Sequence, residues 1–235
     1  MANLDGRQLV DETRGISIGV DLGKLQDHTA IVIAEGQVRS GSEEHVVIRS
    51  IERKRLGTDY KAIARRLADI NEKLACLASE DNSRRKAHRV LGGSLPPVKG
   101  PTFYIDVTGL GGPFCDFLMG ESPELKVVAV SITAGDRVSE WNSRGKYSVI
   151  HVGKSALVHR LQLLLGTERI HLADTPEAKL LVEELKVFQV SVNESTSHGS
   201  YGAVSGAHDD LVIAAALAAW QRVSNRSFHG SVSYI

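Results

Sequence analysis

Three runs of β-branched residues follow one another near the start of the chain, and they limit the folds open to it. They read ISIGVD (16–21), TAIVIAE (29–35) and HVVIRSIERKR (45–55). Gly, Asp and Ser, which favour turns, separate these runs, so we predict three consecutive antiparallel strands. A sheet that begins with such a meander must be extended and covered by the segments that follow.

The remainder of the chain alternates between helical and strand patterns. Thr58 can cap a helix to about Ser79, because apolar residues recur there at helical spacing. The polar, basic and Gly/Pro-rich stretch 80–101 predicts a long loop. We then expect strands at 102–107 and 125–132, helices at 111–119, 154–166 and 176–187, a Gly/Ser-rich loop to residue 207, and a last helix over 208–222.

Strand–helix alternation after a meander predicts an α/β fold. The order resembles the ribonuclease H-like arrangement: a mixed five-stranded sheet, with three antiparallel strands and then parallel additions, and helices on both faces. We expect residues 1–14 to be an N-terminal tail or linker stub, and residues 15–235 to form a single ribonuclease H-like domain.

Composition narrows the function classes. Lys plus Arg and Asp plus Glu number 28 each, so any nucleic-acid contact must come from local basic clusters or from metal ions. Cys76 and Cys115 form neither a disulfide framework nor a zinc motif, which indicates a reducing compartment. The polar N-terminus is not a signal peptide, and the longest apolar run, 211–220, is about half the ~20 residues of a spanning helix. A soluble intracellular protein is expected.

Two of the predicted strands end in an aspartate. Asp21 shares its face of the strand with Ser17 and Gly19, and Asp106 lies at the C-terminal end of the strand at 102–107. Gly23 lets backbone come close just past Asp21. If the two strands are neighbours, both carboxylates lie side by side, where they repel each other and raise each other's pKa. A divalent cation would remove that repulsion.

A third acidic position opens the last helix, AHDDLVIAAALAAW. The helix is almost wholly apolar and must lie against the sheet, while its N-terminus favours the carboxylates of Asp209 and Asp210. Because successive helical residues diverge by about 100°, both cannot point directly at one ion. One is a direct ligand, and the other is a cap, a second ligand or an outer-shell group.

Each aspartate also has a structural interpretation. Asp21 and Asp106 are turn residues in that interpretation, Asp209 and Asp210 form a helix N-cap, and Asp27 is a hairpin residue. The conjunction of two strand-end aspartates with a buried helix that opens with two more favours a metal site. Oxygen ligands without a Cys/His cluster suit Mg²⁺ or Mn²⁺.

The chain resembles the nuclease domain of the large terminase subunit of tailed bacteriophages over nearly its whole length. Four segments carry the resemblance: GVDLGKLQDHTAIVI, FYIDVTGLGG, VGKSALVHRLQLLLGTERIHL and SGAHDDLVIAAALAAW. The resemblance implies a metal-dependent endonuclease that cuts concatemeric viral DNA during packaging, with Asp21, Asp106, Asp209 and Asp210 as metal ligands and Asp27 as an auxiliary group. It also implies double-stranded DNA, an ATPase motor domain, the small terminase subunit and the portal as partners, and the host cell cytoplasm as location.

A complete large terminase subunit has an ATPase motor domain before its nuclease domain, and we find no motif of such a motor in this sequence. The letters GKS at 153–155 are not a phosphate-binding loop, because Ser148 stands where that motif needs glycine. ATP-driven translocation is therefore not predicted for this chain.

The expected chemistry is two-metal hydrolysis of a phosphodiester, with ions about 3.5–4 Å apart. We expect Asp21 to bind both ions, with Asp106 and one of Asp209 and Asp210 binding one each. His208 would orient a ligand or a water, or is structural. Basic residues that could contact DNA phosphates, or simply form a solvated surface, are Arg53, Lys54, Arg55, Arg84, Arg85, Lys86, Arg89 and Lys154. The loop 193–207 could form a hairpin over the cleft.

Three other functions fit parts of this pattern. A sugar- or acetate-kinase-like ATP-binding protein of the same superfamily has a similar Asp-x-Gly turn, but it needs two copies of the fold and gives no role to the His-Asp-Asp helix. A Holliday-junction-resolvase-like nuclease shares the carboxylates, although a more basic chain would be expected. A non-catalytic adaptor would tolerate Asp21→Asn.

Overall fold

A mixed eight-stranded sheet forms the centre of the computed structural model, which describes residues 12–23, 27–38, 44–90, 100–109, 111–141, 145–193, 198–203 and 208–220. The strand order is β6-β7-β5-β4-β1-β2-β3-β8, and β9 and β10 form a separate two-stranded sheet. The strands are β1 (Glu12–Asp21), β2 (Ala30–Val38), β3 (Glu44–Arg53), β4 (Thr102–Asp106), β5 (Lys126–Thr133), β6 (Val138–Trp141), β7 (Ser148–Gly153), β8 (Ile170–Leu172), β9 (Phe188–Asn193) and β10 (His198–Ala203).

The predicted meander is confirmed. β1 pairs antiparallel with β2, and β2 pairs antiparallel with β3, whereas β4 and β5 are added in parallel on the other side of β1. The ribonuclease H-like fold class is therefore correct, but β6, β7 and β8 extend the sheet beyond the five predicted strands. β6 and β8 have four and three residues, which is too short for an alternating pattern to be distinguished.

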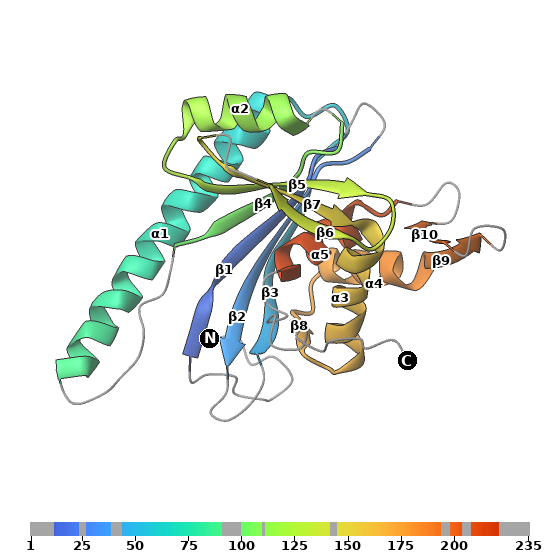
Figure 1. Ribbon diagram of the computed structural model, residues 1–235. Helices are drawn as coiled ribbons and strands as arrows, with labels where there is room; N and C mark the ends of the chain where they lie inside the picture. Colours follow the sequence, from blue (N-terminus) through green and yellow to red (C-terminus); the bar gives the residue numbers. More distant parts are fainter. Residues whose placement is uncertain are drawn as a thin grey trace, which may run out of the picture.

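Helices cover both faces of the sheet, as predicted. They are α1 (Tyr60–Val90), α2 (Gly111–Glu121), α3 (Lys154–Gly166), α4 (Pro176–Val187) and α5 (Asp210–Ala219). In Figure 1, α1 and α2 lie on one side of the sheet and α3, α4 and α5 lie on the other. Each side has its own apolar core: Ile18 and Val20 pack toward α1 and α2, whereas Ala30 and Val32 pack toward the other three helices.

The long loop predicted from residue 80 is wrong at its start, because α1 continues to Val90. The stretch 80–90 contains helix-forming Ala, Arg and Lys and meets no Gly or Pro before Gly92. The start of α1 also differs from the prediction that Thr58 caps the helix. The carboxylate of Asp59 accepts the backbone N–H of Lys61 at 3.3 Å. Leu77, one of the apolar residues at helical spacing in α1, is 57% exposed.

The Gly/Ser-rich segment contributes to a hairpin. β9 and β10 pair antiparallel from Phe188 opposite Ala203 to Asn193 opposite His198. A hairpin is thus present, although its first strand starts five residues before the predicted loop, and its place over the cleft stays a prediction. No helix within the described ranges is long and apolar enough to cross a membrane.

Helix α5 is wholly buried and lies directly on β1. Gly19 has no side chain at the contact, and a Cβ there would collide with the backbone of Ala214 and Ala218. One turn further along α5, the Ser17 hydroxyl donates to the carbonyl of Ala218 at 2.5 Å. The sequence suggested that the small residues on this face of β1 leave room beside Asp21. In the structure, α5 packs against these residues and fills that space.

Candidate metal centre

Asp21 and Asp106 end two neighbouring parallel strands. Val20 on β1 is in register with Ile105 on β4, so the next residue on each strand is an aspartate at the same edge of the sheet. The apolar neighbours of both aspartates point into the core beneath α1 and α2, which turns both carboxylates toward the α5 side. The predicted condition, that these two strands are neighbours, is confirmed.

The contact between α5 and β1 brings a third carboxylate to this edge. Asp210, Ala214 and Ala218 are spaced by four and share one face of α5. Because Ala218 contacts Ser17 and Ala214 contacts Gly19, Asp210, one turn earlier in α5, comes beside Asp21. The close approach at Gly19 thus carries the start of the helix to the ends of two strands.

Three other carboxylates act on that of Asp21. Burial raises the pKa of Asp21 well above its ordinary value, and Asp106, Asp209 and Asp210 raise it further, while Lys154 opposes them. The ionised form is disfavoured because three negative charges surround a partly buried acid. A bound cation would offset this repulsion, so the donor set fits a hard divalent ion with oxygen ligands.

Asp209 stands at the N-cap position of α5 without capping it. Its side chain makes no hydrogen bond to the first turn of the helix. Instead its Oδ2 accepts from Nζ of Lys154, the first residue of α3, at 2.9 Å. The simple N-cap interpretation of this residue is wrong, since the carboxylate faces a lysine that also acts on Asp21.

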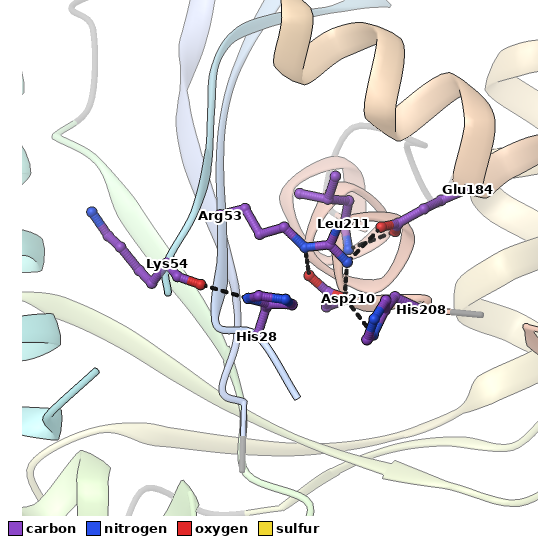
Figure 2. A network of polar contacts seen from close by, with 7 residues as sticks. All are labelled: His28, Arg53, Lys54, Glu184, His208, Asp210 and Leu211. Atoms are coloured by element: carbon purple, nitrogen blue, oxygen red, sulfur yellow. Dashed lines mark hydrogen bonds and ion pairs between the residues drawn. The ribbon is translucent and has the colours of Figure 1, made fainter. Parts of the chain in front are cut away.

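Asp210 is clamped by an arginine at the end of β3. Arg53 donates from Nε and Nη2 to the two oxygens of Asp210, at 2.9 and 2.7 Å. The same Nη2 lies 2.9 Å from Oε1 of Glu184 on α4, as Figure 2 shows. The side chain of Asp210 is only 5% exposed. Arg53, predicted as a DNA contact, is engaged inside the site.

Glu184 belongs to the site and was not predicted. It is buried, and its Oε2 accepts the backbone N–H of Leu211 in the first turn of α5 at 3.1 Å (Figure 2). Burial and Asp210 raise the pKa of Glu184 to about 7, while Arg53 opposes the shift. Its position was detectable: Ala178, Leu181 and Glu184 recur at spacing three on the buried face of α4.

His208 and His28 lie next to the ion pair between Arg53 and Asp210. Nδ1 of His208 lies 3.9 Å from Oδ1 of Asp210, and the ring of His208 meets that of His28 edge to face at 5.4 Å. Nδ1 of His28 is 2.8 Å from the carbonyl oxygen of Lys54. His208 therefore lies beside Asp210, where the sequence suggested it could orient a ligand or a water.

Other predicted residues are not gathered here. Asp27 is exposed and is not among the charges that act on Asp21 in the described chain. Lys54 pairs with Glu52 at 2.5 Å, and Arg55 is exposed. The side chains of the basic residues near the end of α1 lie outside the described residues: Arg84, Arg85, Lys86 and Arg89.

No three His, Cys, Asp or Glu side chains of the described residues form a ready-made chelate. Two of the four acids at this edge are turned onto cationic side chains, Asp209 onto Lys154 and Asp210 onto Arg53. Lys154 and Arg53 thus partly neutralise the negative charge of the site. A divalent ion would have to share Asp209 and Asp210 with these partners.

Comparison with solved structures identifies the fold. The large terminase nuclease of the thermophilic phage G20c, solved with bound magnesium, aligns with a TM-score of 0.54 and 18% identity over 88% of this chain and 81% of that one. The terminase nuclease domain of human cytomegalovirus, soaked in manganese, aligns with a TM-score of 0.47 and 12% identity over 89% and 83%. No family model matches the sequence. None of the curated proteins matches it either.

Proposed function

We propose that this chain, which has the fold of a large terminase nuclease domain, is a divalent-metal-dependent DNA endonuclease that cuts viral DNA during genome packaging. One observation carries the proposal: Asp21, at the end of β1, lies in the combined field of Asp106 from β4 and of Asp209 and Asp210 from the start of α5. Acids brought together from three distant stretches are costly for folding. A role in holding cations explains why the fold tolerates them.

The residues divide the work as follows. Asp21, at the centre of the acids, would bind both ions, while Asp106 and one of Asp209 and Asp210 would bind one each. Mg²⁺ or Mn²⁺ held there would supply Lewis-acid chemistry for phosphodiester hydrolysis, by lowering the pKa of an attacking water and by stabilising the departing 3′ oxygen. Lys154 forms an ion pair with Asp209. It would hold that carboxylate in place, and its positive charge would attract a nearby phosphate of the DNA. His208 would orient a ligand or a water.

Double-stranded DNA is the proposed substrate, and the basic residues at the end of α1 are its proposed phosphate contacts. Arg84, Arg85, Lys86 and Arg89 follow one another closely in the last turns of this helix. Such contacts hold a duplex without reading its sequence. An ATPase motor domain, the small terminase subunit and the portal are the proposed partners in packaging, and the host cytoplasm is the proposed location.

The test is incubation with supercoiled plasmid and Mn²⁺, followed by gel electrophoresis. The protein should produce nicked and linear DNA, EDTA should stop the reaction, and Asp21→Ala should abolish it while the circular dichroism spectrum stays unchanged. Asp174→Ala is the control, since that aspartate is 86% exposed and pairs only with Lys179 among the described residues.

Retained cutting by Asp21→Ala would contradict the role given to this residue. Cutting of four-way junctions but not of duplex plasmid would point to a resolvase instead. Turnover of ATP with sugars, which the proposal does not expect, would point to the kinase-like alternative. Asp27→Ala tests the auxiliary role, and wild-type cutting by that variant would remove Asp27 from the site.

A further inference from the structure

The start of α5 presents a capping problem that the fold solves from outside the helix. The first turn of any helix exposes backbone N–H groups that need acceptors, and the N-cap side chain normally supplies one. Asp209 does not, because its carboxylate is bound to Lys154. Glu184, which lies on α4, accepts the N–H of Leu211 instead. The cap of α5 is therefore provided by a residue of another helix, and not by Asp209.

The same glutamate is joined to Asp210 through an arginine. Arg53 holds both oxygens of Asp210 and also contacts Oε1 of Glu184 at 2.9 Å. We call Arg53 and Glu184 the brace. Its side chains are 20% and 10% exposed, against 5% for Asp210. The brace therefore links β3, α4 and the first turn of α5 through charged groups that are largely shielded from water (Figure 2).

We infer that Arg53 and Glu184 are positioning residues: Arg53 sets the orientation of Asp210, and Glu184 takes over the helix cap that Asp209 does not provide; this inference rests on the proposed function. A guanidinium binds a carboxylate through two parallel hydrogen bonds, which fix the plane of the carboxylate. An ionised carboxylate has about four acceptor sites. Two bonds from Arg53 thus leave lone pairs on both oxygens of Asp210 available to a cation or to a water that a cation holds.

The brace is distinct from a general stabilising ion pair, and the distinction can be measured. Arg53→Lys keeps the charge but cannot form the two parallel bonds. Partners of metal ligands typically change metal affinity by about 10- to 100-fold when mutated. We expect Arg53→Lys to weaken Mn²⁺ binding in calorimetry by about that factor, and to raise the Mn²⁺ concentration for half-maximal plasmid cutting in parallel. Cutting should recover at saturating Mn²⁺.

Arg49→Lys is the matched control. Arg49 lies four residues earlier on β3 and pairs with Glu35 at 2.6 Å on the exposed side of the strand pair. This variant should bind Mn²⁺ as the wild type does. Melting temperatures in EDTA complete the design, because a purely structural ion pair would lower the melting temperature and leave Mn²⁺ affinity of the folded protein unchanged.

Two variants of the glutamate separate the tasks of the brace. Glu184→Gln keeps an oxygen for the N–H of Leu211 but loses the charge that faces Arg53, whereas Glu184→Ala loses both. Mn²⁺ affinity should fall in the order wild type, Gln, Ala. If Glu184→Ala fails to fold, the comparison of Arg53→Lys with Arg49→Lys decides.

The outcomes distinguish the two proposals. Wild-type protein that cuts plasmid, together with Arg53→Lys and Glu184→Gln proteins whose Mn²⁺ affinity stays within about twofold of wild type, far less than such partners usually contribute, would overturn the brace and leave the nuclease intact. Wild-type protein that neither binds Mn²⁺ nor cuts would overturn both.

Discussion

Gly19 on β1 lies directly against the backbone of Ala214 on α5, and this contact determines where the paired aspartates stand. The helix could not approach the strand so closely over any other residue. The same face of α5 carries Asp210 one turn earlier, beside the end of the strand at Asp21. The site therefore depends on a glycine that is not itself part of its chemistry.

Gly19→Ala should destabilise the protein, because a Cβ would overlap the backbone of α5, which cannot move aside as a flexible side chain can. We expect a loss near the upper end of the usual range for overpacking, about 3 kcal/mol, in urea denaturation. Gly120→Ala is the control: a Cβ there meets nothing within 4 Å. An unchanged unfolding midpoint for Gly19→Ala would show that α5 does not sit as described.

Asp21→Asn should stabilise the metal-free protein while it abolishes cutting. The amide keeps the shape of the side chain and removes a charge that burial and three aspartates disfavour. In EDTA the melting temperature should rise by about 2–4 °C, which corresponds to about 1 kcal/mol in a chain of this size. Asp174→Asn, at an exposed position, should leave it unchanged. A lower melting temperature for Asp21→Asn would contradict the repulsion among the four acids.

Glu52 should contribute stability that depends on pH. Burial opposes its ionisation, but hydrogen bonds from Arg66 and Lys54 outweigh burial and lower the pKa of Glu52 below its ordinary value. The folded protein thus binds this proton less readily than the unfolded chain. The contribution is present above the unfolded pKa and is lost as pH falls through the folded pKa.

The measurement is urea denaturation of wild type and Glu52→Gln across the acidic range. The difference in free energy of unfolding should be greatest at neutral pH and should shrink as the solution becomes acidic. Arg66→Gln, which removes a partner that contacts Glu52 at 2.5 Å, should reduce the same difference. A difference that is constant with pH would contradict the lowered pKa.

Arg85→Ala should weaken duplex DNA binding without changing Mn²⁺ affinity. Each lost phosphate contact lowers the salt dependence of binding by a slope of about 0.9, which fluorescence anisotropy at several salt concentrations can resolve. Arg65→Ala is the control, since Arg65 is exposed nearer the start of the same helix. An unchanged salt slope for Arg85→Ala would exclude this end of α1 from the interface.

The elements with long, regular patterns were predictable from the sequence. α3 and α4 have the predicted bounds, and the meander has the predicted order, because periodicity over many residues is a local property. The strands β6, β7 and β8 were not predicted, and α1 continues through a basic stretch that was predicted as a loop. Both errors arise where local composition carries little information about pairing.

The candidate acids could be read from local patterns: Asp21 and Asp106 lie at strand ends, and Asp209 and Asp210 lie at the start of a helix that had to be buried. The partner of each acid, in contrast, follows from how distant elements pack. Arg53 on β3 reaches Asp210 across 157 positions of the chain, Glu184 on α4 reaches the N–H of Leu211 across 27, and Lys154 reaches Asp209 across 55. Alternation and helical spacing describe neighbours along the chain, whereas an ion pair between distant elements depends on how those elements pack.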